Sequence, residues 1–141
     1  MDLERAVTLL RENRQSVLIT QRANGRPQSS NVIHVVGDDG LARVSITADR
    51  AKYANLCRTP LASLHVNRAD FWAYVVVDAD VSLSPVAEAT EDDTVDALVD
   101  IYRAMAGEHA DWDDYRRAMV ADRRLVATLT PTHAYGMWPE G

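Results

Sequence analysis

The sequence predicts a mainly β fold (β + α): a six-stranded antiparallel β-barrel, closed or partly open, with flanking helices and a helical insertion before the last strand. Three observations predict it. Six stretches have the composition of short strands. Tight turns join the first three into a meander. Closing such a meander removes exposed strand edges, which favours a barrel.

The chain begins with an amphipathic helix over residues 2–13. Leu3, Val7 and Leu10 recur on one face, and Asp2 can cap the first turn. This helix therefore has one apolar side to pack against the barrel.

The meander follows, with predicted strands over residues 16–21, 27–36 and 41–48. Asn24-Gly25 makes the first turn, because both residues tolerate positive φ. Gly37-Asp38-Asp39-Gly40 makes the second. These connections are too short for anything but antiparallel neighbours.

A short helix opens at Arg50 and ends near Pro60, because proline disfavours helical geometry in the residue before it. Two more strands are predicted, over residues 61–67 and 72–83. The second is apolar on both faces at its centre, which is typical of a strand buried between layers.

The insertion consists of two helices, over residues 92–106 and 111–120. Apolar residues recur at helical spacing in the first, and Gly107 ends it. The second has acids early and bases later, as the helix dipole prefers. The last strand, over residues 124–135, is expected to be interrupted at Thr130-Pro131-Thr132.

Length and charge limit the functional classes. A chain of 141 residues forms one domain, residues 1–141, with a core that needs no disulfide. The net charge of −6 argues against general nucleic-acid binding, which needs a basic face. It does not exclude a local basic pocket for a small-molecule ligand.

The single cysteine, Cys57, excludes an internal disulfide and fits a reducing cytoplasm. We expect a buried structural thiol, because Cys57 lies in the apolar part of the short helix. No signal peptide is recognisable, and no apolar run is long enough to cross a membrane, so we expect a cytoplasmic protein.

Arg50 and Lys52 are the most informative pair. Two cations at a helix start oppose the helix dipole. The same geometry suits a bound anion, because free backbone N–H groups and basic side chains converge on a phosphate. The pair is therefore a candidate phosphate clamp. The alternative is that both side chains are simply solvated in a loop.

A second candidate is the polar run Gln28-Ser29-Ser30-Asn31, followed by Val32. A strand buried on one face should alternate, so four consecutive polar residues indicate a strand that lines a wet or ligand-filled cavity. An exposed edge strand is the alternative. On the next strand, Ser45 and Thr47 share one face and can approach the same anion. Ordinary strand hydroxyls are the alternative there.

The remaining chemistry-bearing residues give weaker signals. The four histidines have no metal-ligand spacing, so we expect no metal site. The acids near residue 92 are interpreted as a helix cap. Aromatic rings, including those of Trp72 and Tyr74, can cover a planar ligand or anchor a subunit interface, with core packing as the alternative. The sequence identifies no side chain as a catalytic proton donor.

Three motifs occur in order: Gly25-Arg26-Pro27-Gln28-x-Ser30-Asn31-Val32, Val44-Ser45-Ile46 and Arg50-Ala51-Lys52-x-x-Asn55-Leu56. In this order they resemble the pyridoxamine 5′-phosphate oxidase-like, FMN-binding split β-barrel family. Within that family, the chain is most similar to the actinobacterial branch that uses the deazaflavin coenzyme F420. The segment from Asp92 to Val120 and the ending His133-x-Tyr135-Gly136 share the resemblance, which covers nearly the whole chain.

The resemblance implies an F420-dependent oxidoreductase that transfers hydride between the reduced deazaflavin and an organic acceptor. It also implies a homodimer with sites between the two barrels. Arg50 and Lys52 would hold the coenzyme's phosphate side and tail. The other cofactor-binding residues implied are Gln28, Ser30, Asn31 and Val32, then Ser45, Ile46 and Thr47, with Trp72 and Tyr74 contributed by the partner chain.

Two departures and two alternatives accompany this resemblance. Tyr53 stands where relatives often have a small polar residue, and Ala79 where many have glycine. An FMN-binding oxidoreductase is one alternative, because FMN needs the same clamp. A basic track at the groove mouth, formed by Arg26 or Arg58, would favour F420, whose anionic extension is longer. The other alternative is an F420 carrier without turnover.

Overall fold

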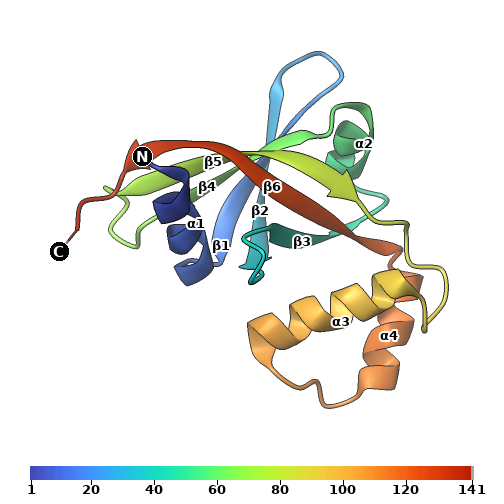
Figure 1. The fold of residues 1–141 in the computed structure, drawn as a ribbon. Coiled ribbons are helices and arrows are strands. Elements are labelled where there is room, and N and C mark those ends of the chain that lie inside the picture. The colour runs from blue at the N-terminus through green and yellow to red at the C-terminus, as the bar shows by residue number, and fades with distance from the viewer. Residues whose placement is uncertain (141) are drawn as a thin grey trace.

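The computed structural model describes residues 1–140 and contains six strands that form a closed antiparallel barrel in the order β1-β2-β3-β6-β5-β4. Four helices flank the barrel (Figure 1). In chain order the elements are α1 (Leu3–Glu12), β1 (Gln15–Gln21), β2 (Pro27–Val36), β3 (Ala42–Thr47), α2 (Ala51–Arg58), β4 (Leu61–Asn67), β5 (Tyr74–Leu83), α3 (Asp93–Ala106), α4 (Trp112–Ala121) and β6 (Arg124–Met137). The predicted fold class is confirmed.

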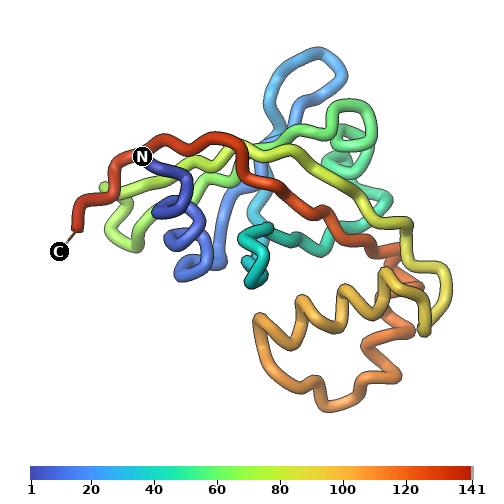
Figure 2. Tube along the Cα trace, in the orientation of Figure 1, coloured from blue at the N-terminus to red at the C-terminus, as the bar shows by residue number. Residues whose placement is uncertain are grey.

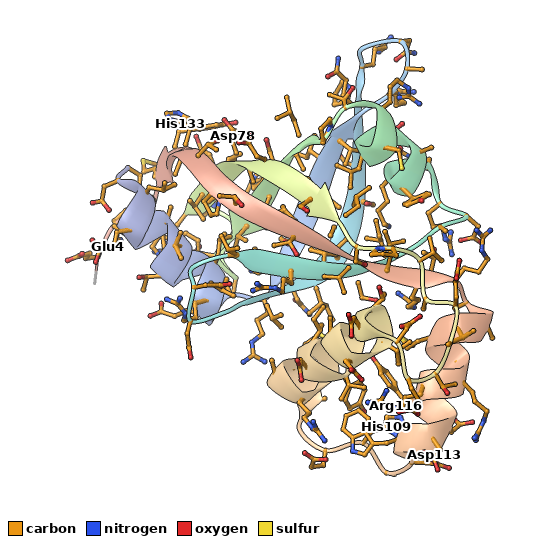
Figure 3. The ribbon with its side chains drawn as sticks, turned by 45° about the vertical axis from the view of Figure 1, so that its right-hand side comes forward. Glu4, Asp78, His109, Asp113, Arg116 and His133 are labelled. Carbon is orange, nitrogen blue, oxygen red and sulfur yellow. The ribbon has the colours of Figure 1, made fainter. Side chains whose placement is uncertain are left out.

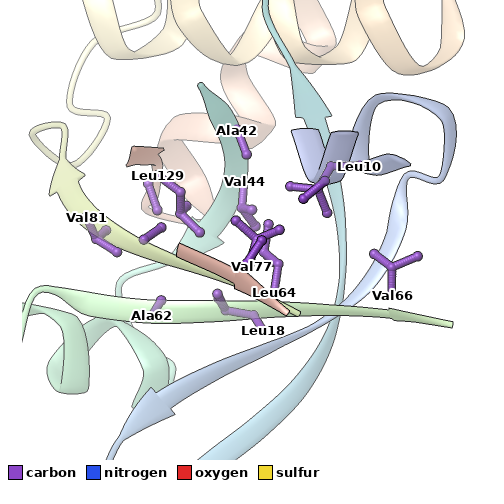
Figure 4. Packing of buried hydrophobic residues seen from close by; sticks show 14 of the residues in the cluster. Leu10, Leu18, Ala42, Val44, Ala62, Leu64, Val66, Val77, Val81 and Leu129 are labelled. Atoms are coloured by element: carbon purple, nitrogen blue, oxygen red, sulfur yellow. The ribbon is translucent and has the colours of Figure 1, made fainter. Parts of the chain in front are cut away.

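Alternation along each strand builds the barrel interior. In β3, for example, Val44 and Ile46 are buried while Ser45 and Thr47 face outward. The inward side chains from all six strands meet in one cluster (Figure 4). Helix α1 adds Leu9 and Leu10 to this cluster. Its predicted cap is present, since the Arg5 N–H donates to Asp2 Oδ1 at 2.8 Å.

His34 links the barrel to α1 and is a structural histidine. Its ring is fully buried. Nε2 lies 2.8 Å from the Leu10 carbonyl oxygen, so Nε2–H is the donor there. Nδ1 then accepts from the Ser16 hydroxyl, also at 2.8 Å. A neutral imidazole satisfies both contacts.

The barrel is incompletely paired at one seam. Strand β2 pairs with β1 from Pro27 to Ile33, but it pairs with β3 only from His34 to Val36. The His34 N–H donates to the Arg14 carbonyl on the β1 side, so the main-chain groups of Asn31 and Ile33 point toward the seam. The pairing of β2 with β3 ends before Asn31, so the main-chain groups of Asn31 have no partner on β3.

Helices α3 and α4 form a hairpin that lies beside this seam, outside the barrel (Figures 1 and 2). Val95, Leu98 and Ile101 of α3 pack with Val35 of β2 and Val126 of β6 in a second apolar cluster. Figure 3 shows His109 and Arg116 within this hairpin, remote from Asp78 and His133 on the barrel.

The base of the hairpin is fastened to the barrel. The Ser84 N–H donates to the Val126 carbonyl at 2.9 Å, and the Ala87 N–H donates to the Arg124 carbonyl at 2.8 Å. The Ser84 hydroxyl also accepts from the Val126 N–H at 2.9 Å. The chain thus leaves and re-enters the barrel at adjacent points.

Three expectations from the sequence need correction. Strand β5 begins at Tyr74, because residues 68–73 form a turn in which the Arg68 N–H donates to the Ala73 carbonyl. The interruption in β6 is a register shift opposite Asp78 and Ala79, and the strand continues to Met137. Cys57 is exposed, because Asn55 and Leu56 occupy the face of α2 that turns toward the barrel.

Candidate functional site

A groove of about 480 Å³ runs along the seam between the barrel and the α3–α4 hairpin. Strands β2 and β3 form one wall, the helical hairpin forms the other, and the start of α2 closes one side. Of the residues singled out in the sequence, those that line it are Asn31, Val32, Ser45, Ile46, Thr47, Arg50 and Lys52. The structure thus brings together the polar strand, the hydroxyl-bearing strand and the basic pair.

Three cations converge in the groove: Arg50, Lys52 and Arg124. Arg50 is the N-cap residue of α2, which has no side-chain cap and no acid in its first turn. Among residues 1–140, no carboxylate forms an ion pair with Arg50 or Lys52. Arg124 donates from Nη1 to Ser45 Oγ at 3.1 Å, while its Nε lies 4.0 Å from Asp122 Oδ2.

The electrostatics of Lys52 reflect this crowding. Partial burial lowers the pKa of the Lys52 ammonium below its usual value, and the positive charges of Arg50 and Arg124 lower the pKa further. A bound anion would reverse the electrostatic part of this effect. The side of the groove at α2 is therefore suited to a phosphate group.

The other walls have different chemistry. Helices α3 and α4 supply an apolar and aromatic surface made of Ile101, Tyr102, Met105, Tyr115 and Met119. Opposite it lies the seam of β2, with the main-chain groups of Asn31 and Ile33. A planar heterocycle can pack against the first wall and form hydrogen bonds with the second.

A second, smaller cavity of about 390 Å³ adjoins the groove. It shares Thr47, Arg50, Asp122 and Arg124 with the groove and adds Asp49, Ala121 and Arg123, so three arginines and two aspartates line it. Arg123 has a positive φ of 53° at the turn between α4 and β6. Arg123 is the one cation that this cavity adds to those of the groove. Neither Arg26 nor Arg58, the two residues suggested by the sequence, lines either cavity, and Arg58 instead donates to Asn55 Oδ1 at 3.4 Å.

Four of the residues singled out in the sequence do not line the groove: Gln28, Ser30, Trp72 and Tyr74. Gln28 accepts a hydrogen bond of 2.6 Å from Asn55. Ser30 lies across from Leu18 in the β1–β2 pairing. Trp72 is 73% exposed, and the Tyr74 ring packs at 5.6 Å from the ring of His65 on the outer face of the barrel.

Sequence reasoning missed Arg124 and the apolar wall of α3 and α4. One weak signal exists for Arg124, because it starts a strand next to an acidic and basic turn. Its place beside Thr47 depends on the antiparallel register of β3 and β6, which pairs these two residues. The apolar residues of the wall have ordinary helical spacing and are indistinguishable from core residues in the sequence.

Comparison with known proteins settles the family. The model of the family described as pyridoxamine 5′-phosphate oxidase matches residues 3–137. The chain belongs to the pyridoxamine 5′-phosphate oxidase family. The resemblance to this family that the sequence indicates is thus confirmed.

Solved structures with the same fold support the architecture. A conserved hypothetical protein from Mycobacterium tuberculosis has a TM-score of 0.74 at 17% identity, covering 97% of this chain and 84% of its own. An F420 reductase has a TM-score of 0.69 at 22% identity, covering 91% and 94%. HutZ, a heme storage protein from Vibrio cholerae, has a TM-score of 0.66 at 19% identity, covering 97% and 96%. At these identities the likeness concerns the fold.

Within residues 1–140, no three His, Cys, Asp or Glu side chains gather where they could hold a metal ion. None of the helices in the described part of the chain has the length and apolar character that a membrane crossing requires.

Proposed function

We propose that this protein is an oxidoreductase that binds coenzyme F420 in the groove and transfers hydride between the reduced deazaflavin and an organic acceptor. One observation carries the proposal: Arg50, Lys52 and Arg124 line the groove at the start of α2, and among residues 1–140 only Arg124 has an ion pair, with Asp122 at 4.0 Å. This arrangement leaves positive charge available for a phosphate-bearing ligand.

The residues present fit the coenzyme. Arg50 and Lys52 would hold its phosphate, with Arg124 and the Ser45 hydroxyl beside them. The cavity that contains Arg123 would take the anionic tail. The ring would lie between the β2 seam and the Met and Tyr side chains of the helical hairpin. An F420 reductase shares the fold, which is consistent with this use of the groove.

The bound deazaflavin would supply the hydride, and the protein would supply position and exclusion of water. Met105 and Met119 line the groove and give its helical wall an apolar surface. Tyr115 is a poor proton source, because burial raises the pKa of its phenol and its hydroxyl already donates to the Leu98 carbonyl at 2.9 Å. Tyr102 is the other tyrosine that lines the groove.

We also propose that the protein works as a homodimer. Large apolar side chains are exposed on the outer face of the barrel and on the β4–β5 turn: Ile33, Leu61, Phe71, Trp72, Tyr135 and Met137. In such a dimer, Trp72 and Tyr74 would contribute to the partner's groove, as the sequence resemblance implies. Sedimentation at micromolar concentration should give twice the mass of the chain, and Trp72→Ser should weaken the association.

Two alternatives share the fold. An FMN-binding oxidoreductase would use the same clamp. The second cavity, with three arginines against two aspartates, supports the coenzyme with the longer anionic extension. A carrier would bind F420 without turnover.

Titration of purified apoprotein with F420 and with FMN, followed by fluorescence, tests which coenzyme binds more tightly. We expect F420 to bind more tightly, and Lys52→Ala to weaken it. Tight FMN binding without F420 binding would replace the proposal with the first alternative. Saturable F420 binding without reduction of quinones, nitroaromatics, enones or tetrapyrroles would support the carrier.

A further inference from the structure

A buried hydrogen-bond network connects α2 to the β1–β2 hairpin. Asn55 of α2 is only 5% exposed. Its Nδ2 donates to Gln28 Oε1 at 2.6 Å and to Thr20 Oγ1 at 3.2 Å. Thr20 and Gln28 face each other across the two strands, so one amide bridges the hairpin. With Arg58 donating to Asn55 Oδ1, the buried amide has a partner for each polar atom.

This network matters because α2 has little else to fix its position. It has only eight residues, it begins with cations that oppose its dipole, and it lacks a side-chain cap. Leu56 anchors it in the barrel core, but an apolar contact is not directional. The amide of Asn55 supplies the directional contact. Lys52 lies three residues earlier, on the same side of the helix.

Gln28 also belongs to β2, the strand whose seam lines the groove across from the start of α2. Three residues further along β2, Asn31 begins the segment that lines the seam. The contact between Gln28 and Asn55 therefore joins the element that carries the basic pair to the element that carries the seam. A ligand that spans both would depend on the spacing between them.

We propose that Gln28 is a positioning residue: through Asn55 it fixes α2, and hence Lys52, relative to the seam of β2, without touching the ligand. This inference rests on the proposed function, in which one coenzyme contacts both elements. It gives Gln28 a different role from the coenzyme contact that the sequence motif implies.

The test uses two changes at one position. Gln28→Met keeps the length of the side chain and removes the acceptor, whereas Gln28→Glu retains an acceptor for Asn55. Gln21→Met, at the exposed end of β1, is the matched control. F420 and FMN are titrated into each variant, and hydrogen exchange of the amides of residues 51–58 is measured without ligand.

Gln28→Met should weaken coenzyme binding roughly tenfold, the usual effect of one strong hydrogen bond. It should also speed amide exchange in α2 by a similar factor. Gln28→Glu and Gln21→Met should stay within about threefold of the wild type in both measurements. If Gln28→Met fails to fold, Thr20→Val removes the other acceptor and should give smaller changes in the same direction.

Weaker binding with unchanged exchange in α2 would mean that Gln28 contacts the ligand directly, and would overturn the proposal. Faster exchange with unchanged affinity would reduce the network to a structural role and overturn it as well. If the wild type binds neither coenzyme, the proposed function fails. The exchange data then decide separately whether Gln28 holds α2, and unchanged exchange in Gln28→Met would reject that too.

Discussion

Arg124 donates a hydrogen bond of 3.1 Å from Nη1 to Ser45 Oγ, which places the first residue of β6 against the outward face of β3. This contact brings a third cation to the groove, from a segment far from Arg50 and Lys52 in the sequence. It also ties the serine of the Val44-Ser45-Ile46 motif to the cationic cluster.

Replacing Arg124 with Gln should weaken binding of a phosphate-bearing ligand roughly tenfold, because a charge-assisted contact is lost while a donor for Ser45 remains. Isothermal titration with F420 measures the change. Arg117→Gln is the control, since Arg117 lies on the exposed side of α4, where it faces Asp114. Equal affinities for the wild type and Arg124→Gln would remove Arg124 from the site.

Lys52→Ala should lower coenzyme affinity by roughly ten- to a hundred-fold, the range for hydrogen bonds to a charged group. The thermal midpoint should change by less than about 2 °C, because Lys52 has no ion-pair partner among residues 1–140 and loses only a crowded charge. Differential scanning fluorimetry beside the titration separates the two effects. A large fall in melting temperature with unchanged affinity would make Lys52 structural.

Substitution of Arg123 should distinguish the two coenzymes. Arg123 lines the second cavity but not the groove. Arg123→Asn should therefore weaken F420 binding about fivefold to tenfold and leave FMN binding unchanged. Asparagine is chosen because it tolerates the positive φ of this position. An equal loss of affinity for both coenzymes would show that the second cavity does not receive the tail of F420.

Stability should decline in acid because of His34. Burial lowers the pKa of this imidazole below its usual 6.5, although the hydrogen bond to Leu10 partly opposes the shift. The unfolded chain then binds more protons than the folded chain below pH 6.5. The contribution of neutral His34 to the free energy of unfolding is fully present above pH 6.5. It is lost as the pH falls toward the lowered pKa, by up to about 1.4 kcal/mol per pH unit.

Urea unfolding between pH 8 and pH 5 measures this dependence. His133 is exposed and provides the comparison, since His133→Gln should leave the pH dependence of the free energy of unfolding as it is in the wild type. His34→Gln should reduce the free energy of unfolding at pH 8 and make it fall less between pH 6.5 and pH 5. If the fall is unchanged in His34→Gln, other groups take up the protons.

Gly136→Ala should be strongly destabilising. Gly136 has a φ of 148°, and an added Cβ would overlap the carbonyl oxygen of Tyr74 on β5. We expect a loss of roughly 3–5 kcal/mol from backbone strain and overpacking together. Gly40→Ala is the control: its φ is 78° with open space around it, so only the strain of about 1–2 kcal/mol applies. Similar losses at both sites would contradict the close approach of β6 to β5.

Most of the fold could be predicted from the sequence because local signals were strong. Asp2, Asp92 and Gly107 mark helix ends, and the structure uses each of them as a cap. The errors have local physical causes. Asp70 draws the chain into a turn by accepting from Arg68 and from the Trp72 N–H, which delays the start of β5. A helix of eight residues buries only one narrow face, and Cys57 lies outside it.

The site was less predictable, because it combines segments whose contact depends on tertiary structure. The basic pair, the hydroxyl strand and part of the polar strand could be named from motifs, and they do line one groove. Gln28 could not be told apart from its neighbours, because its bond to Asn55 depends on how α2 packs. Arg123 and Arg124 needed the register between β3 and β6.

The attachment of the helical hairpin at Ser84 and Arg124 has a consequence for engineering. Because the chain departs from the barrel and returns to it at neighbouring points, residues between them can be shortened, extended or replaced without altering the order of the strands. The helical side of the groove is thus an insertion between β5 and β6 that packs on Val35 and Val126, while Arg50 and Lys52 belong to the scaffold. Libraries confined to α3 and α4 would vary which molecules enter the groove and leave the anion-holding side as it is.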